Sequence, residues 1–172
     1  MDCYRKSAVE AFEKVETLVR AWLEEERITR VDVYLNGLGD VGDTRCRLKT
    51  DGERKSVHID RNAGSTINKL RGMQALPGRG AWFYSHLWME MPEGVLHQES
   101  DWMCEPDMGF DEVPLGSCKT ELDRYPRDQE FIPDWLRYKV ERWRLERGPV
   151  VARRVAHLEE EFRLEGGKYL YP

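Results

Sequence analysis

Residues 81–103 read AWFYSHLWMEM, then PEG, then VLHQESDWM, and this stretch decides what kind of fold the chain can form. Its flanks are rich in aromatic residues, which favour β-strands, and Pro92-Glu93-Gly94 supplies the residues of a turn. We therefore predict an antiparallel hairpin with strands Ala81–Met91 and Val95–Met103. An isolated hairpin is only marginally stable in water, so neighbouring segments must add strands and helices to it.

The sequence upstream supplies further strands. Residues 31–35 alternate between apolar and polar side chains, as in a half-buried strand, and residues 45–60 indicate a second hairpin with Asp51-Gly52 as its tight turn. A glycine-rich run, residues 36–43, lies between them. No Gly-Lys-Ser/Thr follows this run and no helix starts there, so we interpret it as a connection between strands and not as a phosphate-binding loop.

Apolar side chains recur at helical spacing over residues 9–23 and 64–73. Residues 104–117 indicate an acidic loop, and residues 120–124 a single helical turn. Pro133 predicts the start of another helix, because its fixed φ suits the first turn, and Gly148-Pro149 predicts the end of that helix and the start of a last one. Residues 1–147 are expected to form one domain, with residues 148–172 as a helical extension packed on it.

This order of elements contains no repeated βαβ unit. We therefore predict an α+β fold: an antiparallel β-sheet of about five strands with helices packed on it, plus C-terminal helices. The chain has 172 residues, 40% of them hydrophobic, and its six Trp, seven Tyr and five Phe exclude a disordered chain.

Membrane and metal-binding classes are not favoured. No apolar run approaches the roughly 20 residues of a membrane span, and no apolar signal core follows Met1, so we expect a cytoplasmic protein without membrane contact. The four cysteines, Cys3, Cys46, Cys104 and Cys118, form no C-x-x-C pair. We expect free thiols, no metal and no cofactor.

The charge is distributed unevenly. The net charge of the chain is −5, yet residues 80–118 contain eight Asp and Glu and not one Lys or Arg. Residues 137–154 hold seven Arg and Lys against two Glu. Carboxylates without neighbouring cations repel one another, and a basic partner surface would offset that cost.

We therefore predict that the acidic middle of the chain binds a protein with a basic cleft, such as a nuclease, because electrostatic attraction speeds such encounters. Direct nucleic-acid binding is not expected there, since phosphates would be repelled. The predicted partner-binding residues are the carboxylates of this stretch and one aromatic: Glu99, Asp101, Trp102, Glu105, Asp107, Asp111 and Glu112.

Two other classes of function stay open. The basic C-terminal helix could make the chain an adaptor or structural subunit that contacts a protein or nucleic acid. An enzyme with a cryptic Cys/His site is the other, since His86 and His97 fall near the two ends of one hairpin and could face Cys104. No histidine pair has the spacing of a metalloprotease helix, and no Gly-x-Ser-x-Gly is present, so we assign no catalytic residue.

Two short segments resemble a known family. They are Gly78-Arg79-Gly80-Ala81-Trp82-Phe83, and residues 121–136, which read ELDRYPRDQEFIPDWL. Together they resemble the YezG-like antitoxin or immunity proteins, strongly over residues 70–137, more weakly over the first helix and hairpins, and not beyond about residue 145. Residues 98–106 depart from the acidic pattern of related sequences.

The resemblance implies an immunity protein that binds and neutralises the toxin domain of a polymorphic or contact-delivered toxin, often a nuclease. It implies no catalysis by this chain. We expect the aromatic and proline residues of the two segments to pack in the core or fix loops, and not to contact the toxin; these residues are Trp82, Phe83, Tyr125, Pro126 and Trp135.

Overall fold

The computed structural model describes residues 2–50, 53–57, 59, 61–109 and 112–164. The helices are α1 (Asp2–Glu25), α2 (Arg61–Met73), α3 (Leu115–Arg124) and α4 (Asp134–Leu164), with a short 3-10 turn at Gln129–Phe131. The strands are β1 (Arg30–Leu38), β2 (Val41–Thr50), β3 (Glu53–Val57), β4 (Tyr84–Glu90) and β5 (Leu96–Asp101). The predicted α+β class is confirmed. No helix in the part of the chain that the structure describes is both long and apolar enough to cross a membrane.

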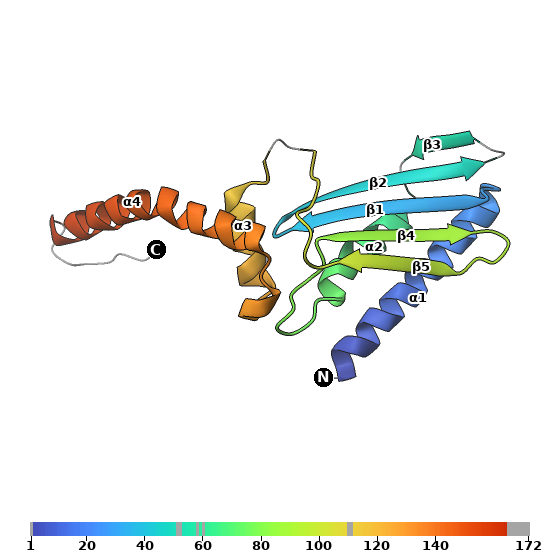
Figure 1. Ribbon diagram of the computed structural model, residues 1–172, viewed down its shortest axis with the longest axis horizontal. Coiled ribbons are helices and arrows are strands. Elements are labelled where there is room, and N and C mark those ends of the chain that lie inside the picture. Colours follow the sequence, from blue (N-terminus) through green and yellow to red (C-terminus); the bar gives the residue numbers. More distant parts are fainter. Residues whose placement is uncertain (1, 51–52, 58, 60, 110–111, 165–172) are drawn as a thin grey trace.

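The strands form one antiparallel sheet in the order β3-β2-β1-β4-β5 (Figure 1). β1 is central because it pairs with both β2 and β4 along most of its length. The glycine-rich run is a connection between strands, as predicted, but it is shorter than expected: β1 and β2 pair up to Leu38 and Val41. The predicted turn Asp51-Gly52 lies outside the described residues, between β2 and β3.

Helices α1 and α2 pack on one face of the sheet and on each other (Figure 1). Alternate residues of β1 point toward them, because side chains in a strand alternate between the two faces. The main core consists of these inward strand residues and the apolar stripes of α1 and α2. Its most deeply buried members include Val15, Leu23, Val31, Ile67, Leu70, Leu87 and Met89.

A second, smaller core closes one end of the sheet. Helices α3 and α4 pack on each other there and bury Phe83, Cys118 and Leu136 completely. The ring of Trp135 meets the ring of Phe83 edge to face at 4.9 Å between centroids, and its indole N–H donates to the Met103 carbonyl at 2.8 Å. Trp82, Phe83 and Trp135 thus have the packing roles that were predicted for them, whereas Pro126 is exposed.

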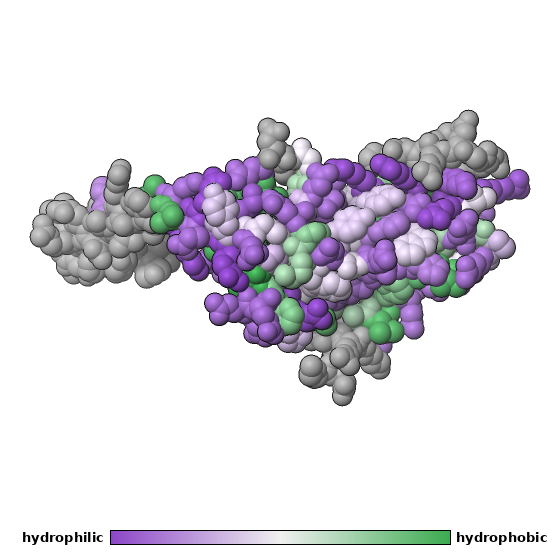
Figure 2. Space-filling view, viewed as in Figure 1, coloured by the Kyte–Doolittle hydropathy of each residue, from purple (hydrophilic) through white to green (hydrophobic). Residues whose placement is uncertain are grey.

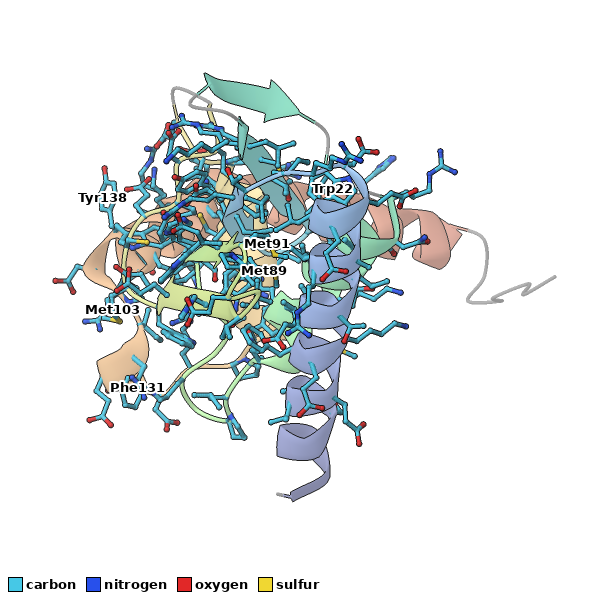
Figure 3. All side chains as sticks on the ribbon, turned by 90° about the vertical axis from the view of Figure 1, so that its right-hand side faces the viewer. Trp22, Met89, Met91, Met103, Phe131 and Tyr138 are labelled. Atoms are coloured by element: carbon cyan, nitrogen blue, oxygen red, sulfur yellow. The ribbon has the colours of Figure 1, made fainter. Side chains whose placement is uncertain are left out.

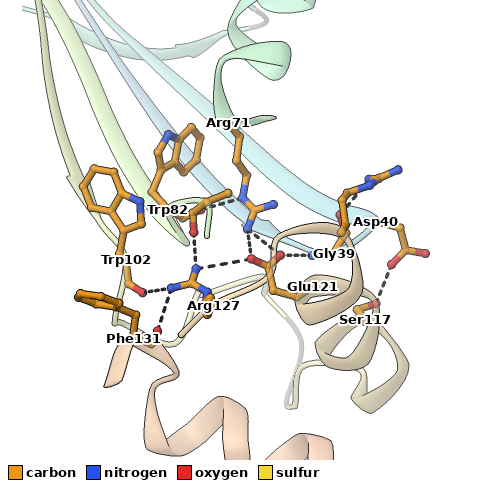
Figure 4. A network of polar contacts seen from close by, with 11 residues as sticks. Gly39, Asp40, Arg71, Trp82, Trp102, Ser117, Glu121, Arg127 and Phe131 are labelled. Atoms are coloured by element: carbon orange, nitrogen blue, oxygen red, sulfur yellow. Dashed lines mark hydrogen bonds and ion pairs between the residues drawn. The ribbon is translucent and has the colours of Figure 1, made fainter. Parts of the chain in front are cut away.

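A buried ionic network joins α3 to the sheet and to the chain that follows it (Figure 4). The Glu121 carboxylate, fully buried, accepts hydrogen bonds from Arg71 at 2.7 and 2.8 Å and from the Gly39 backbone at 2.7 Å. Arg127 lies 3.6 Å from the same carboxylate. Gly39 is required because its φ is +58° and an added Cβ would lie 2.4 Å from the Ser117 carbonyl oxygen.

The two segments that carry the family resemblance contact each other. The Asp128 backbone N–H donates to the Gly78 carbonyl at 2.6 Å, and the Arg127 guanidinium donates to the Ala81 carbonyl. Gly80 has φ +74°, and an added Cβ there would lie 2.5 Å from Arg127 Nε. The shared motif therefore has a structural role, which is to fasten the connection before β4 to the chain after α3.

Two predicted boundaries were wrong. The helical turn expected at residues 120–124 is the ten-residue helix α3, which begins at Leu115 because Pro114 suits a helix start and Gly116 is tolerated in the first turn. Gly148-Pro149 does not end α4, which is one helix of 31 residues.

Pro149 has no N–H to donate to the Leu145 carbonyl. Leu145 is exposed, so water can donate to that carbonyl instead. The predicted packing of residues 148–172 on the domain falls on side chains outside the described residues. Figure 1 shows the second half of α4 extending away from the sheet.

Candidate binding face

In the described part of the chain, the face of the sheet opposite α1 and α2 carries no helix, and only the loop after β5 reaches over one end of it, where Asp107 lies 3.6 Å from Arg45. Among the helices that the structure describes, none lies over it, and Figure 2 shows it as a broad surface of pale and purple side chains. We call this surface the open face. It is formed by the outward residues of four strands: Arg45, Arg47 and Lys49 of β2; Arg30, Asp32 and Tyr34 of β1; Tyr84, His86, Trp88 and Glu90 of β4; and His97, Glu99 and Asp101 of β5.

Four rings form a stacked ladder across the open face. Tyr34 stacks on His86, His86 on Trp88, and Trp88 on His97, with centroids 4.6, 4.8 and 5.2 Å apart. Tyr34 faces His86 in the register of β1 and β4, and Trp88 faces His97 in that of β4 and β5, so the strand spacing sets the stacking distance. The Arg47 guanidinium, 5.4 Å above the Tyr34 ring, ends the ladder on the β2 side.

This stacking determines what the ladder presents to solvent. At these distances the rings of each stacked pair cover part of one another's faces. The inner ring faces are occupied by neighbouring rings, and a nucleobase could not stack on them without separating the ladder. Ring edges offer N–H and O–H groups together with apolar carbon, which suits contact with a protein surface.

A charged cluster holds His86, an inner ring of the ladder. The Asp32 carboxylate accepts two hydrogen bonds from Arg30, both at 2.9 Å, and lies 2.9 Å from His86 Nε2. Burial opposes ionisation of Asp32, but the bonds from Arg30 and His86 outweigh it and hold the pKa of Asp32 below its usual value. The His86 ring is thus held both by its polar contact with Asp32 and by the rings on its two sides.

Histidines and cysteines do not come together as a metal site in the described part of the chain, which contains no group of three or more suitable ligands. The Trp88 ring stands between His86 and His97, so the pair proposed as possible ligands is separated by an indole. Burial raises the pKa of the Cys104 thiol to about 11.

The predicted partner-binding residues on β5 lie at the edge of the open face. Glu99 and Asp101 are exposed, and in the described residues no cation pairs with either. The Asp101 carboxylate also accepts from the backbone N–H groups of Met103 and Cys104, at 2.7 and 3.0 Å, and so shapes the loop that follows. Trp102 is half-buried against the main core, a position that gives it a packing role.

Two predicted carboxylates in the loop before α3 are neutralised by α4. Glu105 pairs with Lys139 at 3.1 Å, and Glu112 pairs with Lys139 at 3.3 Å and with Arg142 at 2.6 Å. Hydrogen bonds from Lys139, together with the charge of Arg142, hold the pKa of Glu112 below its usual value. The inference that the acidic stretch repels itself for want of cations is therefore wrong here, because its cations come from a helix distant in sequence.

The same correction applies in part to Asp107. Its carboxylate lies 3.6 Å from Arg45 of β2, although it is 75% exposed. Asp111, the remaining predicted residue, lies outside the described residues. Among the predicted carboxylates that the structure describes, those without a cation of this chain are therefore Glu99 and Asp101 at the β5 edge.

The open face is consequently bipolar. Arg45, Arg47 and Lys49 line its β2 side, whereas Glu99 and Asp101 line its β5 side. The two sides are three strand spacings apart, about 14 Å. Comparison with protein-family models gave no match for this chain, and a search of the curated proteins gave none.

Of the ladder residues, Tyr34 and Trp88 were not predicted as functional candidates, and His86 and His97 were considered only as possible metal ligands. They share one signal: in β1, β4 and β5 they occupy the positions that alternate with buried residues and therefore face away from the core. A prediction based on net charge does not identify them, because Tyr and Trp rings carry no charge.

Proposed function

We propose that this protein is an immunity-type inhibitor that binds a toxin domain stoichiometrically through its open face and catalyses no reaction. The observation that carries the proposal is the stacked ladder on the sheet face opposite α1 and α2, next to exposed carboxylates on β5. Tyr, Trp and Arg are the residues most enriched at protein interfaces. Rings already held in place lose little conformational entropy on binding, so the ladder is suited to tight association.

The charges of the β5 side support a partner with a basic cleft, as in a nuclease. Glu99 and Asp101 can attract such a cleft at long range, and steered association is fast and sensitive to salt. The family resemblance of residues 78–83 and 121–136 supports the same class of function. We place this action in the cytoplasm, in keeping with the free thiols of Cys46, Cys104 and Cys118.

The alternative, an adaptor that uses its basic C-terminal helix, receives less support. Lys139 and Arg142 at the start of α4 are paired with Glu105 and Glu112, and Arg144 pairs with Glu141. Cations engaged within the chain contribute little to binding phosphates.

A titration tests the proposal. The toxin domain of the proposed partner is mixed with rising amounts of the protein, and its remaining activity is measured. A binding inhibitor should abolish activity linearly up to a fixed ratio near equimolar, and the toxin recovered after denaturation should have an unchanged mass. Full inhibition at about a hundredth of that ratio, or a toxin of altered mass, would show catalysis and overturn the proposal.

A further inference from the structure

A hollow of about 230 Å³ lies on the basic side of the open face, between β1 and β2. Its polar lining consists of Arg30, Asp32, Tyr34, Arg47, Lys49 and His86. Three of these six are permanent cations, and one is a carboxylate. The charge in the hollow is therefore positive, in contrast to the β5 side of the same face.

The cations of the hollow differ in what they are free to bind. Arg30 donates two hydrogen bonds to Asp32 and a third, at 3.2 Å, to Glu90. Arg47 and Lys49 are exposed, and in the part of the chain that the structure describes neither has an ion pair. Arg45, two residues before Arg47 on the same face of β2, is instead paired with Asp43 at 2.7 Å. The surplus charge thus belongs to Arg47 and Lys49.

We infer that this hollow is a carboxylate-binding site, which receives an Asp or Glu side chain of the protein partner while the β5 side contacts that partner's basic groups. The inference rests on the proposed function, because it specifies the chemistry of the surface that the open face recognises. Arginine and lysine form charge-assisted hydrogen bonds to carboxylates, and an arginine can form two parallel ones to the same carboxylate.

The bipolar charge favours a protein over a nucleic acid as the source of the anion. A nucleic acid repeats its phosphates along its length, so a strand crossing the face would bring some of them to Glu99 and Asp101 and be repelled. A protein can place one carboxylate over the hollow and a cation over β5. The two groups should lie about 14 Å apart, the separation of β2 from β5, which an extended segment spans in about four residues.

Selection from a library of random dodecapeptides displayed on phage tests this on the isolated, full-length protein. Peptides retained by the wild type should contain Asp or Glu separated from Lys or Arg by about four residues. Arg47→Gln should weaken those peptides about tenfold or more, the usual consequence of removing one partner of a charge-assisted bond. Arg45→Gln is the matched control on the same strand and face, and should change their affinity by less than about threefold, because Arg45 is already paired within the chain.

Three results would overturn the inference. The first is no enrichment of acidic residues among the retained peptides, and the second is an equal loss of peptide affinity in Arg47→Gln and Arg45→Gln. The third is binding to a fluorescein-labelled random single-stranded oligonucleotide that exceeds peptide binding and is lost in Arg47→Gln. The last would assign the hollow to phosphate. Because no toxin is used, a failed selection leaves the toxin titration unaffected, and a failed titration leaves the peptide result in place.

Discussion

Replacing Glu121 by Gln should destabilise the protein severely, because Glu121 is the only buried carboxylate among the residues labelled in Figure 4. Arg71 and Arg127, each less than a tenth exposed, would keep only neutral acceptors: the Trp82 carbonyl for Arg71, and the carbonyls of Ala81, Trp102 and Phe131 for Arg127. Breaking a buried ion pair by removing one partner costs about 3–5 kcal/mol. The glutamine keeps an acceptor oxygen, so we expect the lower end, about 3 kcal/mol.

That loss is a large part of the 5–15 kcal/mol by which folded domains are usually stable. In a chain of this length it should lower the melting temperature by about 6–12 °C. Urea unfolding followed by circular dichroism gives the free energy directly, provided that the slope against urea stays unchanged.

Asp123→Asn is the matched control on the same helix. Asp123 is exposed and pairs only with Lys119 among the described residues, so its loss should cost less than about 1 kcal/mol. A Glu121→Gln variant within about 1 kcal/mol of the wild type would refute the view that the network holds α3 against the sheet.

Two further predictions concern stability. Trp135→Ala should lower the free energy of unfolding in urea by about 3–5 kcal/mol, since the ring packs on Phe83. Its affinity for the toxin should be unchanged. A variant that melts like the wild type but no longer binds would place Trp135 in the interface. Asp32 has a lowered pKa in the folded state, so its contribution is fully present above about pH 4 and is lost as the pH falls through that lowered value. Asp32→Asn should therefore be less stable than the wild type at about pH 7, and the difference should shrink at about pH 2; an equal difference at both would contradict this.

Much of the fold could be predicted because it depends on local patterns. The alternation in residues 31–35 and the helical spacing in residues 9–23 and 64–73 follow from which side chains face the core, and the aromatic residues of 81–91 favour a strand; the structure has strands and helices there. The order of the strands, with β1 between β2 and β4, was not predicted, since it depends on pairing between segments distant in sequence.

The helices near the C-terminus were harder to predict because proline and glycine can end a helix but can also lie at its start or within it. Pro114 begins α3 and Pro149 lies within α4, yet the sequence around both suggested a loop or a break. Whether proline ends a helix depends on whether another donor can bind the carbonyl that loses its N–H partner. In an exposed helix, water can donate that hydrogen bond.

The ion pairs of the candidate site could not be predicted either, because they join residues distant in sequence. Glu105 and Glu112 looked unpaired because no cation is near them in sequence, but Lys139 and Arg142 reach them from α4. Glu99 and Asp101 keep their predicted character, since the outward side of an edge strand offers few partners.

The central claim, that the open face binds the partner, is tested most directly by the affinity of Trp88→Ala for the proposed toxin partner. Trp88 is the only tryptophan of the stacked ladder, and it contacts both histidines. Trp22→Ala is the matched control, because Figure 3 places Trp22 by α1, on the side of the sheet away from the open face.

Isothermal titration calorimetry should show Trp88→Ala binding at least about 30-fold more weakly, the loss expected of an aromatic hot spot, with Trp22→Ala binding like the wild type. Trp88→Ala that binds with wild-type affinity while Trp22→Ala does not would place the interface on the helical side and contradict the account.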